Sequence, residues 1–346
     1  MKAPLKLTGI LLLIATMLVV SACGGAETKS PTAATAPAAK KSLRVGYLNV
    51  MDDAQAMLAK DAGFYEKNGL DVELQLFDSG TDLIKAIVGG QLQAGVLGFT
   101  NAATWAQKGA DLKVVGGAQM GYHSILVKKG SPIKSVADLK GKKLATQQKG
   151  STADIVLNGV VLPQSGLKRD DVNMVYVSPA VAIQSLAAGQ VDAAFVFEPY
   201  EQIAKATAEV EAIYEIGKVW PFPCMVVITS GKQLETDRAA VDALLAAQQE
   251  AILMLQKQPD QAAKLLTKRF IQEETLTGPG GQVAAVDVVK KAIETQMFHW
   301  EITPDEIKRM QEVVEIMVQQ QIIPESVKVE SFLDLTWQKQ HPGTGH

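Results

Sequence analysis

Short runs of apolar residues alternate along the chain with longer segments in which apolar residues recur every three or four positions. The run at 43–48 (LRVGYL) and the alternating segment at 71–77 (DVELQLF) are typical of strands, and the segment between them at 53–69 is typical of an amphipathic helix. A helix over 82–90 and a short buried strand over 94–99 follow. This alternation predicts an α/β fold with a largely parallel sheet, and the residues after about 231 are mostly helical.

The pattern repeats after 99 residues. Residues 79–101 align with 178–200, and each copy reads as a serine N-cap, a helix, a terminating glycine and a strand. The same shift places 43–56 over 142–155, where a strand again leads through a polar turn into a helix. We therefore predict two similar α/β lobes; the alternative is that both segments are simply common α/β units. The matched positions are Ser79/Ser178, Ile84/Ile183, Gly90/Gly189, Gln91/Gln190 and Ala94/Ala193.

Composition and charge narrow the function. The chain has 346 residues, 47% hydrophobic and 21% charged, which is typical of about two globular domains. The net charge of −3 gives no sign of the basic face that nucleic acid requires. Two cysteines exclude a disulfide framework, and four histidines, two of them in the last six residues, leave little for a metal site. Phosphate-loop, GxSxG, HExxH, CxxC and GxGxxG motifs are absent, so we expect no enzyme, no cofactor and no metal.

The first residues have the features of a secretory signal. Lys2 and Lys6 precede an uncharged apolar run at 7–20, which is shorter than the roughly 20 residues of a membrane span. The sequence Val-Ser-Ala-Cys-Gly at 20–24 resembles a bacterial lipobox, in which the chain is cut before the cysteine and the cysteine is lipidated. We predict a signal peptide over 1–22 and a lipidated Cys23 with a flexible tether over 23–41, which would anchor an extracytoplasmic protein to the membrane. The alternative is an ordinary signal peptide with an incidental cysteine.

The strand ends indicate where a ligand would bind. In open parallel sheets, ligands lie beyond the carboxyl ends of the strands, so two facing lobes would hold a ligand between them. The segment 121–124 is expected to cross from one lobe to the other, and 219–230 is expected to be the return crossing.

A family resemblance adds to this prediction. The lipobox, AGFYEKNGLDVEL, GGQLQAG, SPIKSVADLKGKKLAT, GST and AAGQVDAAFVFEPY, in this order, resemble solute-binding proteins of the nitrate/sulfonate/taurine and thiamine-pyrimidine-precursor group. These are periplasmic-type binding proteins of ABC importers, and the resemblance covers roughly residues 42–340. It implies a two-lobe, type II periplasmic-binding-protein-like fold with a two-segment hinge. Lobe 1 would comprise 42–125 plus 226–346, and lobe 2 would comprise 126–225.

Most candidate site residues have two interpretations. The turn at 150–152 opens a helix and is suited either to an anion or to plain capping. Thr100 and Asn101 could contact the ligand or cap the next helix, whereas Asp52 and Asp53 are expected to cap. His123 is either a cleft-floor ligand contact or a structural histidine. The candidate ligand-binding residues are Tyr47, Asn49, Phe99, Thr100, Asn101, His123, Gln148, Gly150, Ser151, Thr152 and Glu198.

Glu198 bears on the class of ligand. If its carboxylate faces the cleft, it would repel a bare anion such as nitrate and favour a solute that carries an amine; otherwise it caps a helix. We predict a monomeric ABC-importer binding protein for a small organic solute, an aliphatic sulfonate or taurine, delivered to a permease and its ATPase subunits. The alternatives within that role are a thiamine-pyrimidine precursor or related heterocycle, nitrate and bicarbonate. A pyrimidine-precursor-synthesis enzyme and a receptor-coupled sensor module are the alternatives outside it.

Overall fold

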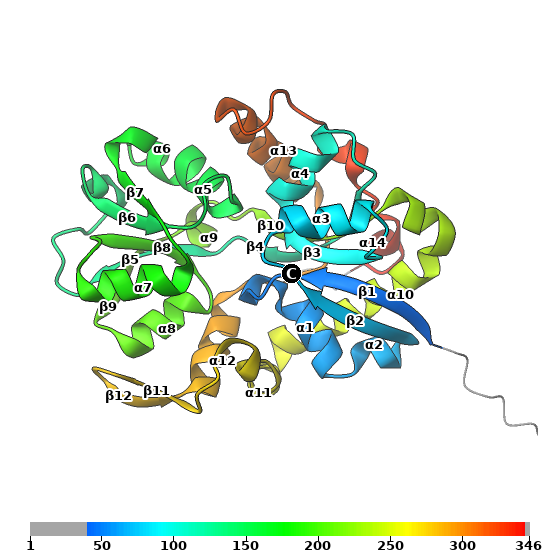
Figure 1. Ribbon diagram of the computed structural model, residues 1–346, viewed down its shortest axis with the longest axis horizontal. Helices are drawn as coiled ribbons and strands as arrows, with labels where there is room; N and C mark the ends of the chain where they lie inside the picture. Colours follow the sequence, from blue (N-terminus) through cyan, green and yellow to red (C-terminus); the bar gives the residue numbers. More distant parts are fainter. Residues whose placement is uncertain (1–39, 343–346) are drawn as a thin grey trace, which may run out of the picture. The chain divides into compact units, whose positions relative to one another are not determined.

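The computed structural model describes residues 40–342, which fold around two separate five-stranded sheets (Figure 1). The signal peptide, the lipidated Cys23 and nearly all of the tether predicted for 1–41 lie outside the described residues. In the described part of the chain, no helix has both the length and the apolar character needed to cross a membrane.

The first sheet has the strand order β2-β1-β3-β10-β4, and the second sheet has the order β7-β6-β8-β5-β9. In both sheets the first three strands are parallel, and the fourth strand, β10 or β5, runs antiparallel to its neighbours. The strands are β1 (Lys41–Tyr47), β2 (Leu70–Leu76), β3 (Ala94–Gly98), β4 (Lys113–Met120), β5 (His123–Lys128), β6 (Lys143–Thr146), β7 (Asn173–Tyr176), β8 (Ala193–Phe197), β9 (Val210–Glu215) and β10 (Pro223–Thr229).

The predicted repeat is present in the strand pairing itself. Val45 of β1 pairs with Ala94 of β3, and 99 residues later Leu144 of β6 pairs with Ala193 of β8. The serine caps also recur, because Ser79 accepts from the amide of Asp82 and Ser178 accepts from the amide of Val181. The prediction of two similar α/β lobes is confirmed.

Helices cover both sheets. Those near the first sheet are α1 (Ala54–Asp61), α2 (Phe64–Lys67), α3 (Gly80–Val88) and α4 (Phe99–Gln107), with a 3₁₀ turn at Met51–Asp53 before α1. Those near the second sheet are α5 (Thr152–Val156), a π-helical turn (Leu157–Val161), α6 (Leu162–Gln164), α7 (Pro179–Ala188), α8 (Tyr200–Thr207) and α9 (Ile216–Val219). Further 3₁₀ turns occupy Val136–Leu139, Arg169–Asp171 and Val329–Phe332.

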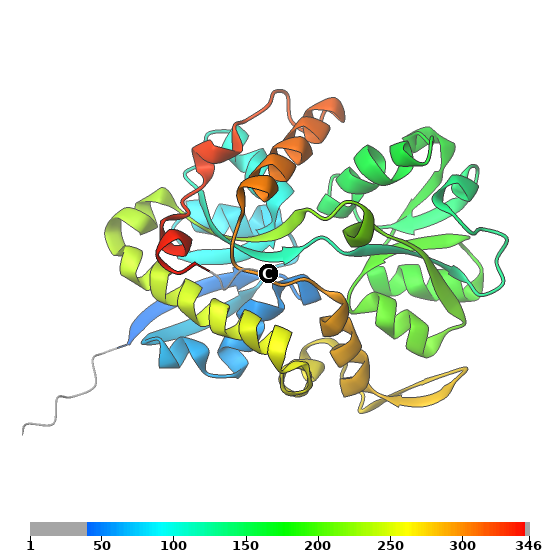
Figure 2. The ribbon, with the colours of Figure 1, turned by 180° about the vertical axis from the view of Figure 1, so that it is seen from behind.

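The C-terminal segment contacts the layers of both sheets. The long helix α10 (Gly231–Lys257) packs on α1 and α2, whereas α12 (Ala285–Thr295) and the strand β11 (Thr275–Gly278) contact α8 beside the second sheet (Figure 2). The remaining elements are α11 (Pro259–Phe270), β12 (Gly281–Ala284), α13 (Pro304–Gln319) and α14 (Thr336–Gln340). The sequence analysis assigned the segment after β10 to lobe 1, but this segment also contacts α8 beside the second sheet.

Two chain segments cross between the sheets side by side. One runs from β4 into β5, and the other runs from β9 through α9 into β10 (Figures 1 and 2). They are joined where the Gly121 amide donates to the Phe222 carbonyl at 2.8 Å. A Cβ on Gly121 would lie 2.1 Å from the Phe222 ring, so only glycine fits at this crossing. The crossings lie at the segments that the sequence predicted, 121–124 and 219–230.

Candidate functional site

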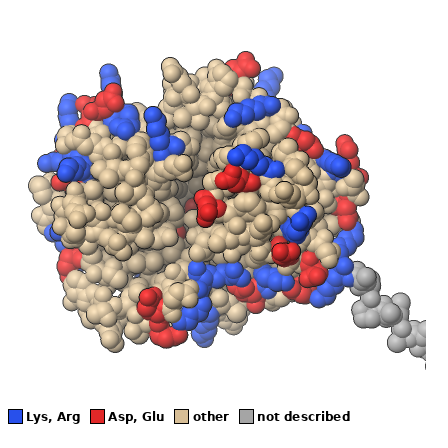
Figure 3. All heavy atoms as spheres, viewed as in Figure 1, with Lys and Arg blue, Asp and Glu red and all other residues tan. Residues whose placement is uncertain are grey.

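A cavity of about 510 Å³ lies between the two sheets, at the carboxyl ends of their parallel strands. Figure 3 shows a recess in the middle of this face of the molecule. The turns after β1, β2, β3 and β6 contribute to its wall, as do the ends of β5, β8 and β10 that lie nearest the crossings. The lining residues are Leu48, Val50, Asp52, Asp78, Ser79, Gly80, Thr81, Gly98, Asn101, His123, Gln147, Gln148, Lys149, Gly150, Ser151, Thr152, Ala153, Phe197, Cys224 and Met225.

The structure brings six of the predicted site residues to this cavity. Asn101 lies in α4 beside the first sheet, and His123 begins β5 in the second sheet. The other four belong to the turn that leads from β6 into α5. The six residues are Asn101, His123, Gln148, Gly150, Ser151 and Thr152.

The turn before α5 is held by Asp154. Its carboxylate accepts from the Gly150 amide at 2.8 Å and from the Tyr176 hydroxyl at 3.0 Å. Ser151 is the N-cap and accepts from the Asp154 amide at 3.2 Å, so the capping interpretation of this serine holds. Capping does not exclude ligand contact, because Ser151 also lines the cavity. The turn is fixed by its own hydrogen bonds and presents Lys149 and Thr152 beside the cavity.

The other five predicted residues do not line the cavity. The Phe99 ring is fully buried and stacks on Phe332 at a centroid distance of 6.2 Å, because α4 turns this side of the helix into the core. Tyr47 and Asn49 face Arg269 instead: the guanidinium lies 3.5 Å from the Tyr47 hydroxyl, and the Asn49 amide donates to the Arg269 carbonyl at 3.1 Å.

Thr100 and Thr152 link the two lobes beside the cavity. Their hydroxyl oxygens are 2.6 Å apart, so the start of α4 is hydrogen-bonded to the start of α5. A second link lies nearby, where the side-chain amide of Gln320 donates to the Ile155 carbonyl at 2.8 Å. Thr100 is thus engaged in joining the lobes.

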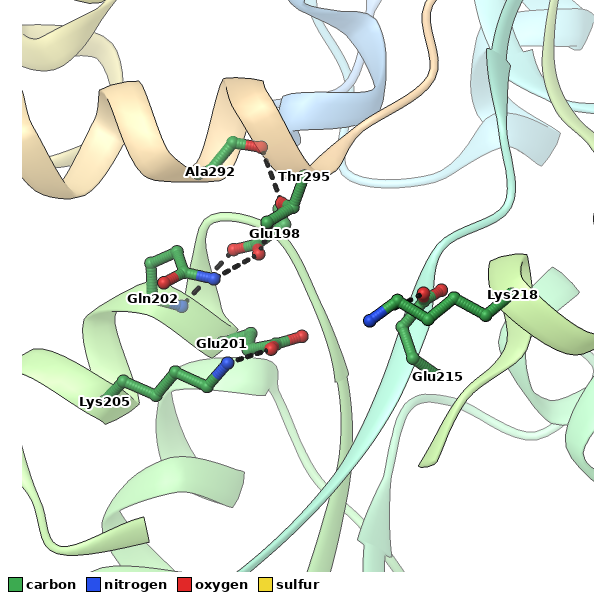
Figure 4. Close-up of polar contacts among 8 residues, drawn as sticks. All are labelled: Glu198, Glu201, Gln202, Lys205, Glu215, Lys218, Ala292 and Thr295. Carbon is green, nitrogen blue, oxygen red and sulfur yellow. Dashed lines mark hydrogen bonds and ion pairs between the residues drawn. The ribbon is translucent and has the colours of Figure 1, made fainter. Parts of the chain in front are cut away.

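Glu198 is buried against the C-terminal segment (Figure 4). Its carboxyl group accepts from the backbone and side-chain amides of Gln202 at 3.3 and 2.8 Å, and it lies 2.8 Å from the Thr295 hydroxyl of α12. The contact with the Gln202 amide fits the capping interpretation. Burial, and to a smaller extent the charge of Glu201, raises the pKa of Glu198 to about 7. Glu198 does not line the cavity.

Two acids line the cavity, Asp52 and Asp78, and Asp52 is the buried one. Its side chain is 4% exposed, and burial, followed by the charge of Glu198, raises its pKa to about 8. The neighbouring Asp53 does not cap α1 with its side chain, which corrects the sequence expectation; it accepts from the Leu48 amide at 2.8 Å instead. Asp52 was considered only as a cap, and its place in the turn after β1 was the signal that could have identified it.

His123 and Cys224 complete the buried floor of the cavity. His123 is 3% exposed, rests against Phe195 and Phe197, and has its pKa lowered to about 4 by burial, so its ring is neutral at pH 7. Burial, together with the charges of Asp52 and Asp53, raises the pKa of the Cys224 thiol well above its usual range. A nucleophilic cysteine requires a lowered pKa, so this thiol is poorly suited to covalent catalysis.

The site therefore combines two different surfaces. Its floor is buried, polar and close to uncharged at neutral pH. Its wall carries the ammonium group of Lys149, the exposed carboxyl group of Asp78 and several hydroxyl groups. Two further polar groups at the second sheet, Thr146 Oγ1 and Gln147 Nε2, are buried without a hydrogen-bond partner among the described residues. Such groups are commonly satisfied by a bound molecule or by water. The arrangement is suited to holding a small polar solute.

Comparison with known proteins gives concordant results. Residues 36–268 match the model of the NMT1-like family. A Brucella abortus relative assigned as a binding protein is 31% identical over 159 residues, which are 45% of this chain and 48% of that protein. The chain thus matches about half the length of the first curated relatives. An Escherichia coli relative assigned as an aliphatic sulfonates-binding protein is 29% identical over 258 residues, 72% of this chain and 78% of that protein.

A solved structure shares the fold over most of the chain. The crystal structure of the periplasmic aliphatic sulphonate binding protein from Escherichia coli superposes with a TM-score of 0.73 at 25% identity. The match covers 86% of this chain and 98% of that one. The predicted two-lobe periplasmic-binding-protein fold is confirmed.

Proposed function

The chain belongs to the NMT1-like family, and we propose that it is the solute-binding component of an ABC importer. The observation that carries the proposal is the polar cavity of about 510 Å³ between two hinged sheets, within the usual range of small-molecule sites. Relatives named for binding aliphatic sulfonates and taurine support the same role. Because these relatives include a periplasmic protein, we place the chain outside the cytoplasm.

We propose that the solute is a small organosulfonate such as taurine. The Lys149 ammonium and the hydroxyls of Ser151 and Thr152 would bind the sulfonate oxygens, since charge-assisted hydrogen bonds to anions are among the strongest in proteins. Asp52 would receive the amine, which would stabilise its ionised form. Asn101 would contact the solute from the first sheet, so that binding joins both lobes and favours closure.

A heterocycle of the thiamine-pyrimidine type is the second candidate solute. Phe197 lines the cavity and makes an edge contact with His123, which gives the floor an aromatic surface. A buried carboxyl such as Asp52 is suited to the amino and ring-nitrogen pair of an aminopyrimidine. Tyr47 and Phe99, two aromatic residues among the candidates from the sequence, do not contribute to this surface, because neither lines the cavity.

The remaining parts of the proposal follow from the sequence. We propose that a signal peptide over 1–22 directs export and that the lipidated Cys23 and the tether hold the body at the membrane. Lobe 1 (42–125 plus 226–346) and lobe 2 (126–225) would present the loaded, monomeric protein to a permease and its ATPase subunits. The protein would act without catalysing a reaction.

A thermal-shift panel tests the solute class. The panel contains taurine, alkanesulfonates, nitrate, bicarbonate and aminopyrimidines. Each solute is tested with the wild type, with Lys149→Gln and with Lys142→Gln. A solute at 100 times its dissociation constant adds about 2.7 kcal/mol to the unfolding free energy, which raises the melting temperature by several degrees. We expect a shift with taurine that Lys149→Gln reduces and that Lys142→Gln leaves intact, because Lys142 is a half-buried lysine that does not line the cavity. Shifts only with aminopyrimidines would favour the second candidate, and a response only to nitrate or bicarbonate would contradict both.

A further inference from the structure

Three buried side chains with different donor atoms meet at the floor of the cavity. A carboxylate oxygen of Asp52, a ring nitrogen of His123 and the sulfur of Cys224 all lie within 4.8 Å of one another. The three residues are 4%, 3% and 2% exposed. This cluster could not be predicted from the sequence, because its members belong to three separate segments and the low number of histidines argued against any metal site.

Two polar atoms of the cluster lack hydrogen-bond partners among the described residues. Asp52 Oδ1 and His123 Nδ1 are buried and form no hydrogen bond among the described residues. Unpaired buried polar atoms are unfavourable, so a group that binds them would remove this destabilisation. Both residues line the cavity, which gives a ligand access to them.

The carboxyl groups in and behind the floor also have no cationic partner among the described residues. Asp52, Asp53 and Glu198 are all buried, and no ion pair between the described residues includes any of the three. Buried carboxyl groups without a cation are unusual unless they are protonated or bind a metal. A divalent cation held by one carboxylate and one thiolate would form a neutral unit.

We propose that Asp52, His123 and Cys224 form a binding site for a zinc-class divalent cation. Thiolate, imidazole and carboxylate are the three ligand types that Zn²⁺ uses in proteins, and three protein ligands leave a fourth, open position. All three residues line the cavity, so an oxygen or amine of the solute could take the open position. With the cation bound, Asp52 would coordinate the metal and would no longer receive the solute amine directly. The thiol proton, and the carboxyl proton where present, leave to solvent when the cation binds.

The geometry requires only a small contraction. Zinc–ligand distances of about 2.0–2.3 Å place tetrahedral ligands roughly 3.5 Å apart, somewhat closer than the present upper limit of 4.8 Å. His123 begins β5 just after one crossing, and Cys224 lies in β10 just after the other. A cation between them would therefore hold the two crossing segments together, beyond any role in the proposed solute binding.

Direct metal titration tests the site. The chain carrying Cys23→Ser, which has Cys224 as its single cysteine, is treated with chelator and titrated with Zn²⁺ by calorimetry and with Co²⁺ by absorption spectroscopy. We expect one Zn²⁺ per chain, and a Co²⁺ spectrum with a thiolate charge-transfer band and the intense visible bands of tetrahedral coordination. Replacing a ligand, as in Cys224→Ser or Asp52→Asn, should weaken Zn²⁺ binding by about 100-fold or more, because the three ligands act together.

Matched controls separate this site from surface binding. His299 is another buried histidine, and its ring contacts Glu306 at 3.0 Å, so His299→Gln should leave the Zn²⁺ affinity and the Co²⁺ spectrum unchanged. Circular dichroism verifies that each variant is folded. The proposal is overturned if Zn²⁺ does not bind at one per chain, or if Cys224→Ser and Asp52→Asn retain the wild-type affinity and spectrum.

The two proposals fail in different ways. A taurine shift that persists in chelator, together with no Zn²⁺ binding, would refute the metal site and leave the solute-binding role standing. Stoichiometric Zn²⁺ binding with no response to any solute would support the metal site and count against the proposed function.

Discussion

The pH dependence of stability at Glu198 provides a quantitative test of the buried carboxyl groups. Thr295 has one hydroxyl proton but two acceptors, Glu198 Oε1 at 2.8 Å and the Ala292 carbonyl at 2.9 Å (Figure 4). A protonated Glu198 resolves this conflict, because it can donate to Thr295 while Thr295 donates to Ala292. The contacts therefore agree with the direction of the pKa change, which raises the pKa from 4.5 to about 7 through burial and then the charge of Glu201.

The sign of the effect follows from linkage. The folded protein holds the Glu198 proton more tightly than the unfolded chain, so the stabilisation is complete below pH 4.5 and is lost as the pH rises through 7. Integrating between pH 5 and pH 8 gives a loss of about 2.5 kcal/mol from this residue. Glu198→Gln mimics the protonated acid and removes the titration. We expect the variant to be about 2.5 kcal/mol less sensitive to this change of pH than the wild type.

Urea unfolding at pH 5, 6, 7 and 8, followed by circular dichroism, measures this difference. Asp52 remains in both proteins, and its titration differs between them only through the loss of the Glu198 charge, which is the smaller cause of its raised pKa. The control is Glu209→Gln, which removes an exposed carboxylate paired with Lys129 and should change stability by less than about 1 kcal/mol at every pH. A stability difference between wild type and Glu198→Gln that stays constant from pH 5 to pH 8 would refute the reasoning.

Three further perturbations separate the core, the lobe contacts and the site. Phe99→Ala should lower the unfolding free energy by about 3–5 kcal/mol in urea unfolding, because the ring is fully buried against Phe332. A small loss of stability together with a complete loss of solute binding would show that Phe99 contacts the solute after all. Thr100→Val removes the 2.6 Å hydrogen bond with Thr152 that joins the lobes. Calorimetry should show taurine binding weakened by about 5- to 10-fold, since one hydrogen bond contributes roughly 1 kcal/mol. An unchanged affinity would show that this hydrogen bond does not favour closure of the lobes. Gly159→Ala places a Cβ 2.2 Å from Ile316 Cγ2 of α13 and should therefore separate the lobes. Small-angle X-ray scattering would detect this separation as a larger radius of gyration. An unchanged radius would mean that α13 shifts to make room for the added methyl group while the lobes stay in place.

The sequence predicted the fold because its signals were local and repeated. Serine caps, terminating glycines and strands recur at a fixed spacing, and that spacing reappears in the β1/β3 and β6/β8 pairing. The turn before α5 could be predicted for the same reason, since it directly follows a strand end. Such features depend on neighbouring residues alone.

The rest of the site depends on contacts between distant segments. The Phe99 side chain is directed into the core by Phe332, a residue of the C-terminal segment, and Glu198 is buried by Thr295 of α12. Asp52 and Cys224 meet only because β10 returns from the second sheet to pair beside β3. No local pattern around these residues indicates such partners, so these contacts could be found only in the structure.

The central claim is that the solute binds between the two lobes, and calorimetry of taurine with variants on opposite walls tests it most directly. Asn101→Ala alters the wall beside the first sheet, and Ser151→Ala alters the wall beside the second. The account predicts one taurine per chain and weaker binding in both variants. Wild-type affinity in either variant would show that the solute does not bridge the two lobes and would contradict the account.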